Sequence, residues 1–136
     1  MILYRPVGLR ELLLIFQTEM RRFPPRLPEQ PIFYPVLEQS YAEQIARDWN
    51  TKVDDQAGYV LEMEVDDAFI ARYPIQQVGG RVHRELWIPA EELEAFNDHL
   101  VRPIRMVGAF FGDGFKGLEA EGDEVVEAIR EMWRRG

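Results

Sequence analysis

Residues 59–88 read YVLEMEVDDAFIARYPIQQVGGRVHRELWI, and this stretch decides the class of fold. In residues 59–65 every second position is apolar, which is the signature of a β-strand with one buried face. A short helical turn over 67–73 separates this strand from two more, at 74–78 and 84–88. Because the strands come in runs, the stretch predicts an α+β fold rather than a doubly wound parallel sheet.

Further elements are predicted on both sides of this stretch. Apolar residues recur at helical spacing from Leu9, whereas the prolines between Pro24 and Pro31 exclude a helix there. The expected elements are strand 2–5, helix 9–20, strand 32–34, helix 41–49, helix 89–99, strand 104–110 and a C-terminal helix at 118–136. We therefore predict a single domain over 1–136, with a core of about residues 2–110 and a mixed, mainly antiparallel sheet flanked by helices.

The composition excludes several classes of protein. Apolar residues form 46% of the chain and aromatic residues 12%, which suffices for a buried core and excludes disorder. No apolar run approaches the ~18 residues that cross a bilayer, and no secretory signal is visible. We therefore expect a cytoplasmic protein with no membrane partner. The absence of cysteine excludes disulfides and thiolate chemistry.

The charge balance bears on possible partners. The chain carries 24 acidic and 16 basic residues, for a net charge of −8. Duplex nucleic acid is not an expected partner, because binding its phosphates needs a basic face. An acidic surface fits a basic protein better.

Glu85 is the most informative acid in the chain. On the strand 84–88, Leu86 and Ile88 point one way, and Glu85 and Trp87 point the other. A carboxylate beside an indole, just after a Gly-Gly loop, belongs either to a functional site or to a solvated face of the sheet.

Arg5 and the pair Phe33-Tyr34 also allow two interpretations each. Arg5, near the end of the first strand, presents its guanidinium either to an anion or to a structural ion pair. One ring of the Phe33-Tyr34 pair is expected in the core, and the other either packs there too or forms a platform for a flat ligand.

Metal and nucleophile chemistry receive less support. His83 and His99 are the only histidines, and they lie too far apart to form a helical metal-binding pair, so no metal site is expected. Ser40 is the only serine, and it resembles a helix N-cap rather than a nucleophile.

Several segments form a recognisable series when they are taken in order. They are Leu3-Tyr4-Arg5, Phe33-Tyr34-Pro35, Tyr41-Ala42, Ile45-Ala46, Gly58-Tyr59-Val60-Leu61, and Gly79-Gly80 ahead of Glu85-Leu86-Trp87-Ile88-Pro89. The series resembles small bacterial proteins of the ADP-ribosyltransferase-like group, some of which carry the label ADP-ribosylation/crystallin. The resemblance covers about residues 2–110 and rests on the whole pattern.

The resemblance implies a role for four residues. Arg5 would hold NAD, Tyr34 and Tyr41 would flank the nicotinamide, and Glu85, behind a loop over 76–84, would be catalytic. The implied activity is that of an NAD-dependent ADP-ribosyltransferase or NAD glycohydrolase, in which the glutamate stabilises an oxocarbenium-like state without a metal. The acceptor of the ADP-ribose would be water or a protein.

A different class of function also remains open. The same scaffold could serve as a non-catalytic binding module, such as an immunity or antitoxin-like protein, that holds a basic partner. In an unrelated α+β protein, Glu85 and Arg5 would be surface residues. One geometric expectation separates these hypotheses: in an NAD-cleaving enzyme, Arg5 and Glu85 must meet across a single cleft.

Overall fold

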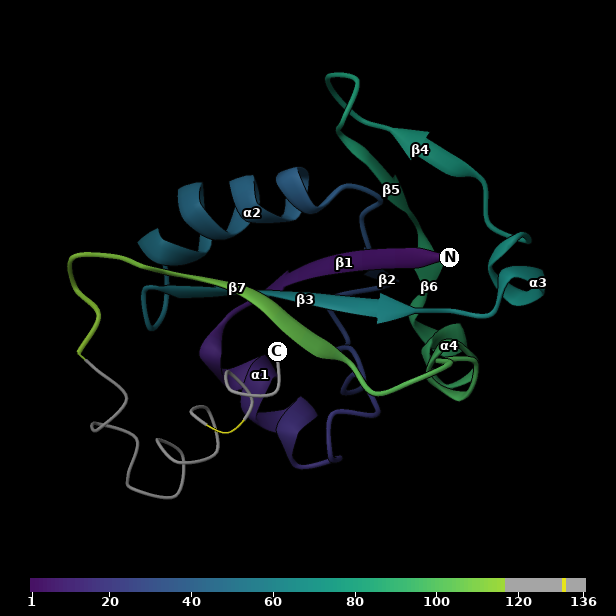
Figure 1. Cartoon of the computed structure of the whole chain (residues 1–136), viewed down its shortest axis with the longest axis horizontal. Helices are drawn as coiled ribbons and strands as arrows, with labels where there is room; N and C mark the ends of the chain where they lie inside the picture. Colours follow the sequence, from purple (N-terminus) through teal and green to yellow (C-terminus); the bar gives the residue numbers. More distant parts are fainter. Residues whose placement is uncertain (117–130, 132–136) are drawn as a thin grey trace.

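The structure, a computed structural model, describes residues 1–116 and 131 of the chain. These residues form an α+β fold of small antiparallel sheets with α-helices around them, which confirms the predicted class (Figure 1). Every strand pairing among them is antiparallel. The helix predicted at 118–136 lies outside the described residues.

A three-stranded sheet forms the centre of the fold. Strand β3 (Ala57–Glu64) lies between β1 (Ile2–Val7) and β7 (Arg105–Phe111). The alternation predicted from the sequence is visible in β3, where Leu61 and Met63 are almost fully buried while the intervening Glu62 is only partly so. The strand is buried over most of its length because both of its edges are paired and helices cover its faces.

A short extended segment joins this sheet to the hairpin that carries Glu85. The hairpin consists of β4 (Ile75–Gln77) and β5 (Arg84–Leu86). Val36 exchanges two backbone hydrogen bonds of 2.8 Å with Tyr4 of β1. On its other side, Leu86 N–H donates to the Pro35 carbonyl at 2.9 Å. The segment therefore places the N-terminal strand and the Glu85 hairpin on one continuous surface.

Pro6 lies inside β1, although a proline was expected to end the first strand. Both polar backbone groups of Tyr4 point toward Val36, and residues two apart in a strand point to the same side. The nitrogen of Pro6 therefore faces away from β3, so its missing N–H removes no hydrogen bond from the β1–β3 ladder. The strand consequently continues to Val7.

Two helices cover opposite faces of the central sheet. Helix α1 (Leu9–Phe16) packs with the core that contains Leu61, whereas α2 (Gln39–Asp48) packs on the face that contains Val60. Helix α2 approaches β3 so closely that a Cβ on Gly58 would lie 2.7 Å from the Ala46 carbonyl oxygen. Glycine at this position is therefore required by the packing of the helix on the sheet.

The smaller elements frame the hairpin, and some of them differ from the sequence prediction. Strand β2 (Ile32–Phe33) pairs with β6 (Ile88–Pro89), so the single strand expected at 84–88 is divided at Trp87. Helix α3 (Asp67–Ile70) begins after the Asp66 cap, and α4 (Leu93–Asp98) follows a 3-10 turn over Ala90–Glu92.

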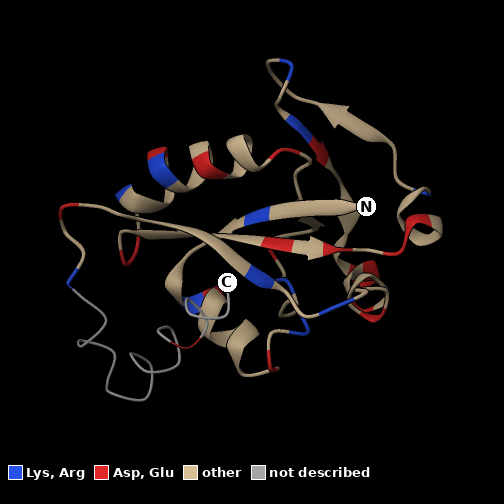
Figure 2. Cartoon of the chain, in the orientation of Figure 1, with Lys and Arg blue, Asp and Glu red and all other residues tan. Residues whose placement is uncertain are grey.

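Two predicted helix ends were wrong. Helix α1 ends at Phe16 and not at residue 20, because Glu19 and Met20 both adopt a φ of 60°, which no helix accommodates. Ser40 lies within α2 and is not its N-cap; Glu38 occupies the cap position. Acidic positions are spread over α2, β3, α3 and α4, whereas β1 carries a basic one (Figure 2).

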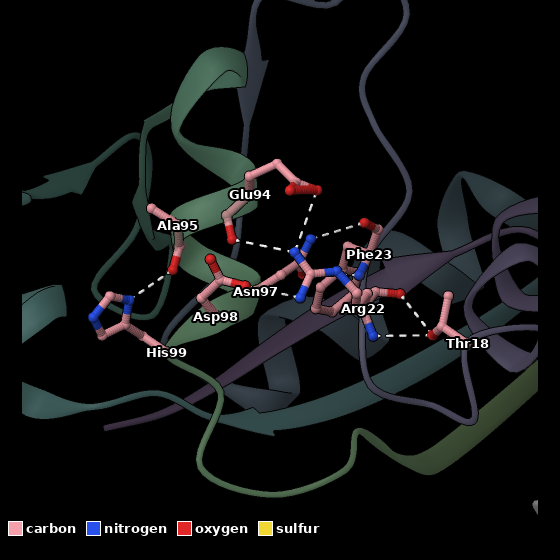
Figure 3. Close-up of polar contacts among 8 residues, drawn as sticks. All are labelled: Thr18, Arg22, Phe23, Glu94, Ala95, Asn97, Asp98 and His99. Carbon is pink, nitrogen blue, oxygen red and sulfur yellow. Dashed lines mark hydrogen bonds and ion pairs between the residues drawn. The ribbon is translucent and has the colours of Figure 1, made fainter.

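The proline-rich segment is fastened to α4 by a buried asparagine. Asn97 accepts a hydrogen bond of 2.9 Å from Phe23 N–H and donates one of 3.0 Å to the Phe23 carbonyl (Figure 3). The Phe23 ring packs 5.1 Å from Phe33 and 6.2 Å from Phe96, measured between ring centroids. The segment after Phe23 therefore starts from a fixed point.

Candidate functional site

A cleft of about 510 Å³ opens between β1, β5 and the C-terminal end of α2. Its volume lies within the range of small-molecule sites. Three residues singled out from the sequence line it, namely Arg5, Tyr34 and Glu85. Trp49, Asn50 and Trp87 line it too. The structure thus brings the early arginine and the late glutamate to one hollow, which is the arrangement that an NAD-cleaving site requires.

Glu85 is held in place by two hydrogen bonds. Trp87 Nε1–H donates to one carboxylate oxygen at 2.8 Å, and the Tyr41 hydroxyl donates to the other at 3.3 Å. Each carboxylate oxygen keeps a lone pair for a further donor. The predicted strand alternation explains this placement, because Leu86 and Ile88 are buried while Glu85 and Trp87 face the cleft.

Arg5 is held by the protein itself. Its Nε and one terminal nitrogen donate to the two oxygens of Glu11 at 2.7 and 2.9 Å, and its guanidinium lies 4.6 Å from the centre of the Phe33 ring. The residue is only 9% exposed. Arg5 therefore lines the cleft as one half of a buried ion pair, and its charge is already compensated.

Aromatic side chains stand exposed around the cleft. Tyr34 is 39% exposed, Trp87 42% and Trp49 64%, and all three line the hollow. Phe33, the neighbour of Tyr34, is 1% exposed and belongs to the core. Exposed aromatic side chains that gather around one hollow mark a possible binding surface, and their flat faces suit a planar ring.

Tyr41 occupies a different place from the one the resemblance implies. It does not line the cleft, and its hydroxyl bonds to Glu85 from behind. Burial raises the pKa of Tyr41, and the negative charge of Glu85 adds to the effect. The Tyr41 ring contacts the ring of His83, with 4.8 Å between centroids, and His83 Nε2 lies 3.0 Å from Gln44 Oε1. Tyr41 thus positions the carboxylate.

Several residues of the cleft were missed at the level of sequence. The sequence predicted a helix over 41–49 without indicating which of its apolar residues would line a site. In the structure the two alanines of this helix are fully buried against the sheet, whereas Ile45 and Trp49 line the cleft. The signal available in the sequence was the size of the side chains. Alanines four residues apart lie where the helix approaches the sheet most closely, so the bulky residues beside them must point elsewhere.

Asn50 and Glu11 gave no signal of their own in the sequence. Asn50 is placed by the 3-10 turn that follows α2, and its buried Oδ1 has no hydrogen-bond partner among the described residues. Glu11 became relevant only because α1 folds back on β1 and brings its carboxylate to Arg5.

Within residues 1–116 and 131, no group of three or more histidine, aspartate or glutamate side chains could hold a metal ion. In the same part of the chain, no helix is both long enough and apolar enough to cross a membrane.

Comparison of the chain with protein-family models, with curated proteins and with solved structures found no match. A functional assignment therefore rests on the geometry of the cleft.

Proposed function

We propose that the protein binds NAD in this cleft on an ADP-ribosyltransferase-like scaffold and cleaves the bond between nicotinamide and ribose. The observation that carries the proposal is the Glu85 carboxylate. It faces a hollow that exposed aromatic rings surround, and two hydrogen bonds orient it there. This combination fits a planar leaving group and a reaction centre that becomes positively charged.

The reaction needs one carboxylate in a fixed position. As the bond from C1′ to the nicotinamide nitrogen breaks, the nicotinamide leaves with the electron pair as a neutral ring, and positive charge develops on the ribose. Glu85 would accept a hydrogen bond from a ribose hydroxyl and stabilise that charge. Water then attacks C1′ and releases a proton, giving ADP-ribose; a protein nucleophile in its place would give a modified protein.

The aromatic rings would hold the leaving group. Tyr34 and Trp87 are exposed on the lining of the cleft and offer flat faces for stacking on nicotinamide. Arg5 contributes through its pair with Glu11 by fixing the floor of the cleft, because its charge is already neutralised. This role differs from the direct hold on NAD that the resemblance implies.

The substitution Glu85→Gln tests the proposal. It keeps the shape of the side chain and removes the charge, so we expect the rate of nicotinamide release from NAD to fall by about 10²–10³-fold. The melting temperature should change little, since the amide oxygen can still accept from Trp87 Nε1–H while the amide NH2 donates to the Tyr41 hydroxyl oxygen. Free nicotinamide is measured by chromatography, and Glu91→Gln, at an exposed position of the 3-10 turn, serves as the matched control.

Two results would contradict the proposal. One is that the unaltered protein releases no nicotinamide from millimolar NAD and shows no change in the fluorescence of the tryptophans at the cleft. The other is that Glu85→Gln and Glu91→Gln behave alike.

A non-catalytic binding module is the second candidate, and the β4–β5 hairpin favours it. Ile75 and Val78 are each 49% exposed and Val82 is 40% exposed, so the hairpin presents aliphatic side chains to solvent. With a net charge of −8, the protein would suit a basic partner. Binding of that partner would weaken with salt and survive Glu85→Gln, which separates this function from the enzymatic one.

A further inference from the structure

A second hollow adjoins the cleft. Its volume is about 590 Å³, and Asn50 lines both hollows. Arg10 and Arg26 contribute basic groups to its lining, and Asp54 and Asp55 contribute acidic ones. A ligand that fills the cleft can therefore extend past Asn50 into a space lined by both positively and negatively charged side chains.

Arg26 is the unusual residue of this second hollow. Its Nε is buried without a hydrogen-bond partner, and no ion pair within residues 1–116 and 131 involves its guanidinium. Glu11, which also lines this hollow, already gives both of its oxygens to Arg5. The cluster of Arg5, Glu11 and Arg26 consequently carries one uncompensated positive charge.

The surroundings of Arg26 disfavour its positive charge. Burial lowers the pKa of Arg26, and the positive charge of Arg5 lowers it further. The opposing effects of Glu11 and Tyr34 are smaller. A partly buried charge with no ion-pair partner among the described residues is unfavourable, so it favours the binding of an anion at this point.

The backbone holds Arg26 in position. The segment starts from Phe23, which Asn97 clasps through two hydrogen bonds (Figure 3), and Pro24, Pro25 and Pro28 limit its freedom on either side of Arg26. Little conformational entropy would be lost when Arg26 binds a ligand, because the chain is already fixed.

We infer that Arg26 forms an anion subsite for the pyrophosphate of a dinucleotide whose nicotinamide and first ribose occupy the cleft. The identity of the dinucleotide rests on the proposed function, whereas the anion subsite rests on the uncompensated guanidinium. Asp54 and Asp55 line the same hollow and can accept hydrogen bonds from sugar hydroxyls. Inorganic pyrophosphate has no such donors, so the hollow favours a nucleotide over the bare anion.

Equilibrium binding tests the inference without any turnover. Titration calorimetry with ADP should show binding to the unaltered protein, and inorganic pyrophosphate should bind more weakly. Arg26→Gln should weaken ADP binding by about tenfold or more, because a charge-assisted hydrogen bond is lost. Binding of nicotinamide, which would need only the cleft, should stay unchanged. Arg26→Lys should keep part of the affinity for ADP.

Arg81→Gln is the matched control, since Arg81 is exposed in the turn between β4 and β5 and lines neither hollow. We expect it to change ADP affinity by less than about threefold. Thermal unfolding shows whether each variant is folded, and ADP should raise the melting temperature of the unaltered protein but not that of Arg26→Gln. Equal ADP affinity in Arg26→Gln and the unaltered protein, or no ADP binding at all, overturns the inference.

The two proposals can fail separately. If ADP binding depends on Arg26 but NAD is never cleaved, the anion subsite stands and the proposed catalysis falls. If nicotinamide is released in a Glu85-dependent way while Arg26→Gln binds ADP normally, the catalysis stands and the subsite is wrong.

Discussion

The two ends of the proline-rich segment use the same residue types in opposite ways. At its start, Asn97 satisfies both polar backbone groups of Phe23, and Arg22 pairs with Asp98 at 2.9 Å and Glu94 at 3.3 Å. Further along, Arg26 has no partner among the described residues, and the Oδ1 of Asn50, which shares its hollow, has none either.

The difference between the two regions separates polar groups that stabilise the fold from polar groups that are available to a ligand. The hydrogen bond with Asp98 raises the pKa of Arg22, whereas burial lowers that of Arg26. Polar groups that form hydrogen bonds with one another stabilise the fold, and removing one of them lowers the free energy of unfolding. Polar groups left unsatisfied beside a hollow contribute little to folding and are available to a ligand.

The largest expected effect is on the free energy of unfolding, at Asn97, whose hydrogen bonds hold the start of the proline-rich segment. Asn97→Ala would leave the N–H and the carbonyl of Phe23 buried without partners, so we expect the free energy of unfolding to fall by about 2–4 kcal/mol. Urea denaturation measures the loss. ADP affinity should also fall, because the segment that carries Arg26 would no longer start from a fixed point.

Asn50→Ala is the counterpart at the hollow, where the buried Oδ1 of Asn50 has no hydrogen-bond partner among the described residues. No side-chain hydrogen bond is lost, so the free energy of unfolding should change by less than about 1 kcal/mol, while ligand binding in the cleft weakens. If Asn50→Ala destabilised the protein as much as Asn97→Ala does, the contrast between the two regions would be wrong.

The second effect concerns the packing of α2 on β3 at Gly58, which fixes the position of the cleft residues on α2 and the turn after it. Gly58→Ala would bring a Cβ within 2.9 Å of both the Cα and the carbonyl oxygen of Ala46, so α2 must move. We expect a loss of about 1–3 kcal/mol and weaker NAD binding, because Trp49 and Asn50 move with the helix. Urea denaturation and tryptophan fluorescence give the two measurements.

Gly8→Ala controls for the loss of a glycine. A Cβ at Gly8 meets no atom within 4 Å, and its φ of −83° is open to any residue. The change in stability should stay below about 1 kcal/mol. Equal losses in the two variants would show that the close approach of α2 to β3 does not limit stability.

The smallest effect at neutral pH is expected at Tyr59, which is unsatisfied but lies in the core. Its hydroxyl is buried without a hydrogen-bond partner in the described part of the chain, so Tyr59→Phe should change stability by less than about 1 kcal/mol and leave ligand binding unaltered. This variant separates an unsatisfied group beside a hollow from one within the core.

Alkaline titration sharpens the test of Tyr59. Burial, with a further contribution from Asp55, raises the pKa of Tyr59 from 10.0 to about 12. The raised pKa favours the protonated folded state, so its contribution to stability is complete below pH 10 and is lost as the pH rises from 10 toward 12. Tyr59→Phe should therefore lose less stability over this interval, as measured by urea denaturation at each pH. An identical decline in both proteins would contradict the assignment.

Local patterns made much of the fold predictable. The alternation in 59–65 and the opposite directions of Glu85 and Leu86 follow from the geometry of a strand, and the structure shows them. The end of α1 could not be predicted, because the apolar spacing continues to Met20 although the backbone turns at Glu19. Met20 is buried by that turn instead of by a helix.

The candidate site was predictable only in its parts. Arg5, Tyr34 and Glu85 were singled out, and they do line one hollow. Their partners could not be found from the sequence, since Glu11 reaches Arg5 and Tyr41 reaches Glu85 only after the helices pack. Trp49 belongs to the predicted helix 41–49, but spacing alone does not show which of two adjacent faces of that helix meets the sheet.

The sequence by itself determined the α+β class, the strands and the side of each strand that carries polar groups, because these depend on periodicities within a few residues. Tertiary structure alone decided which charges are compensated. Arg5 and Arg26 look equally free in the sequence, yet one carboxylate, Glu11, binds the first and leaves the second uncompensated. Such a pairing depends on distances between segments that only packing brings together.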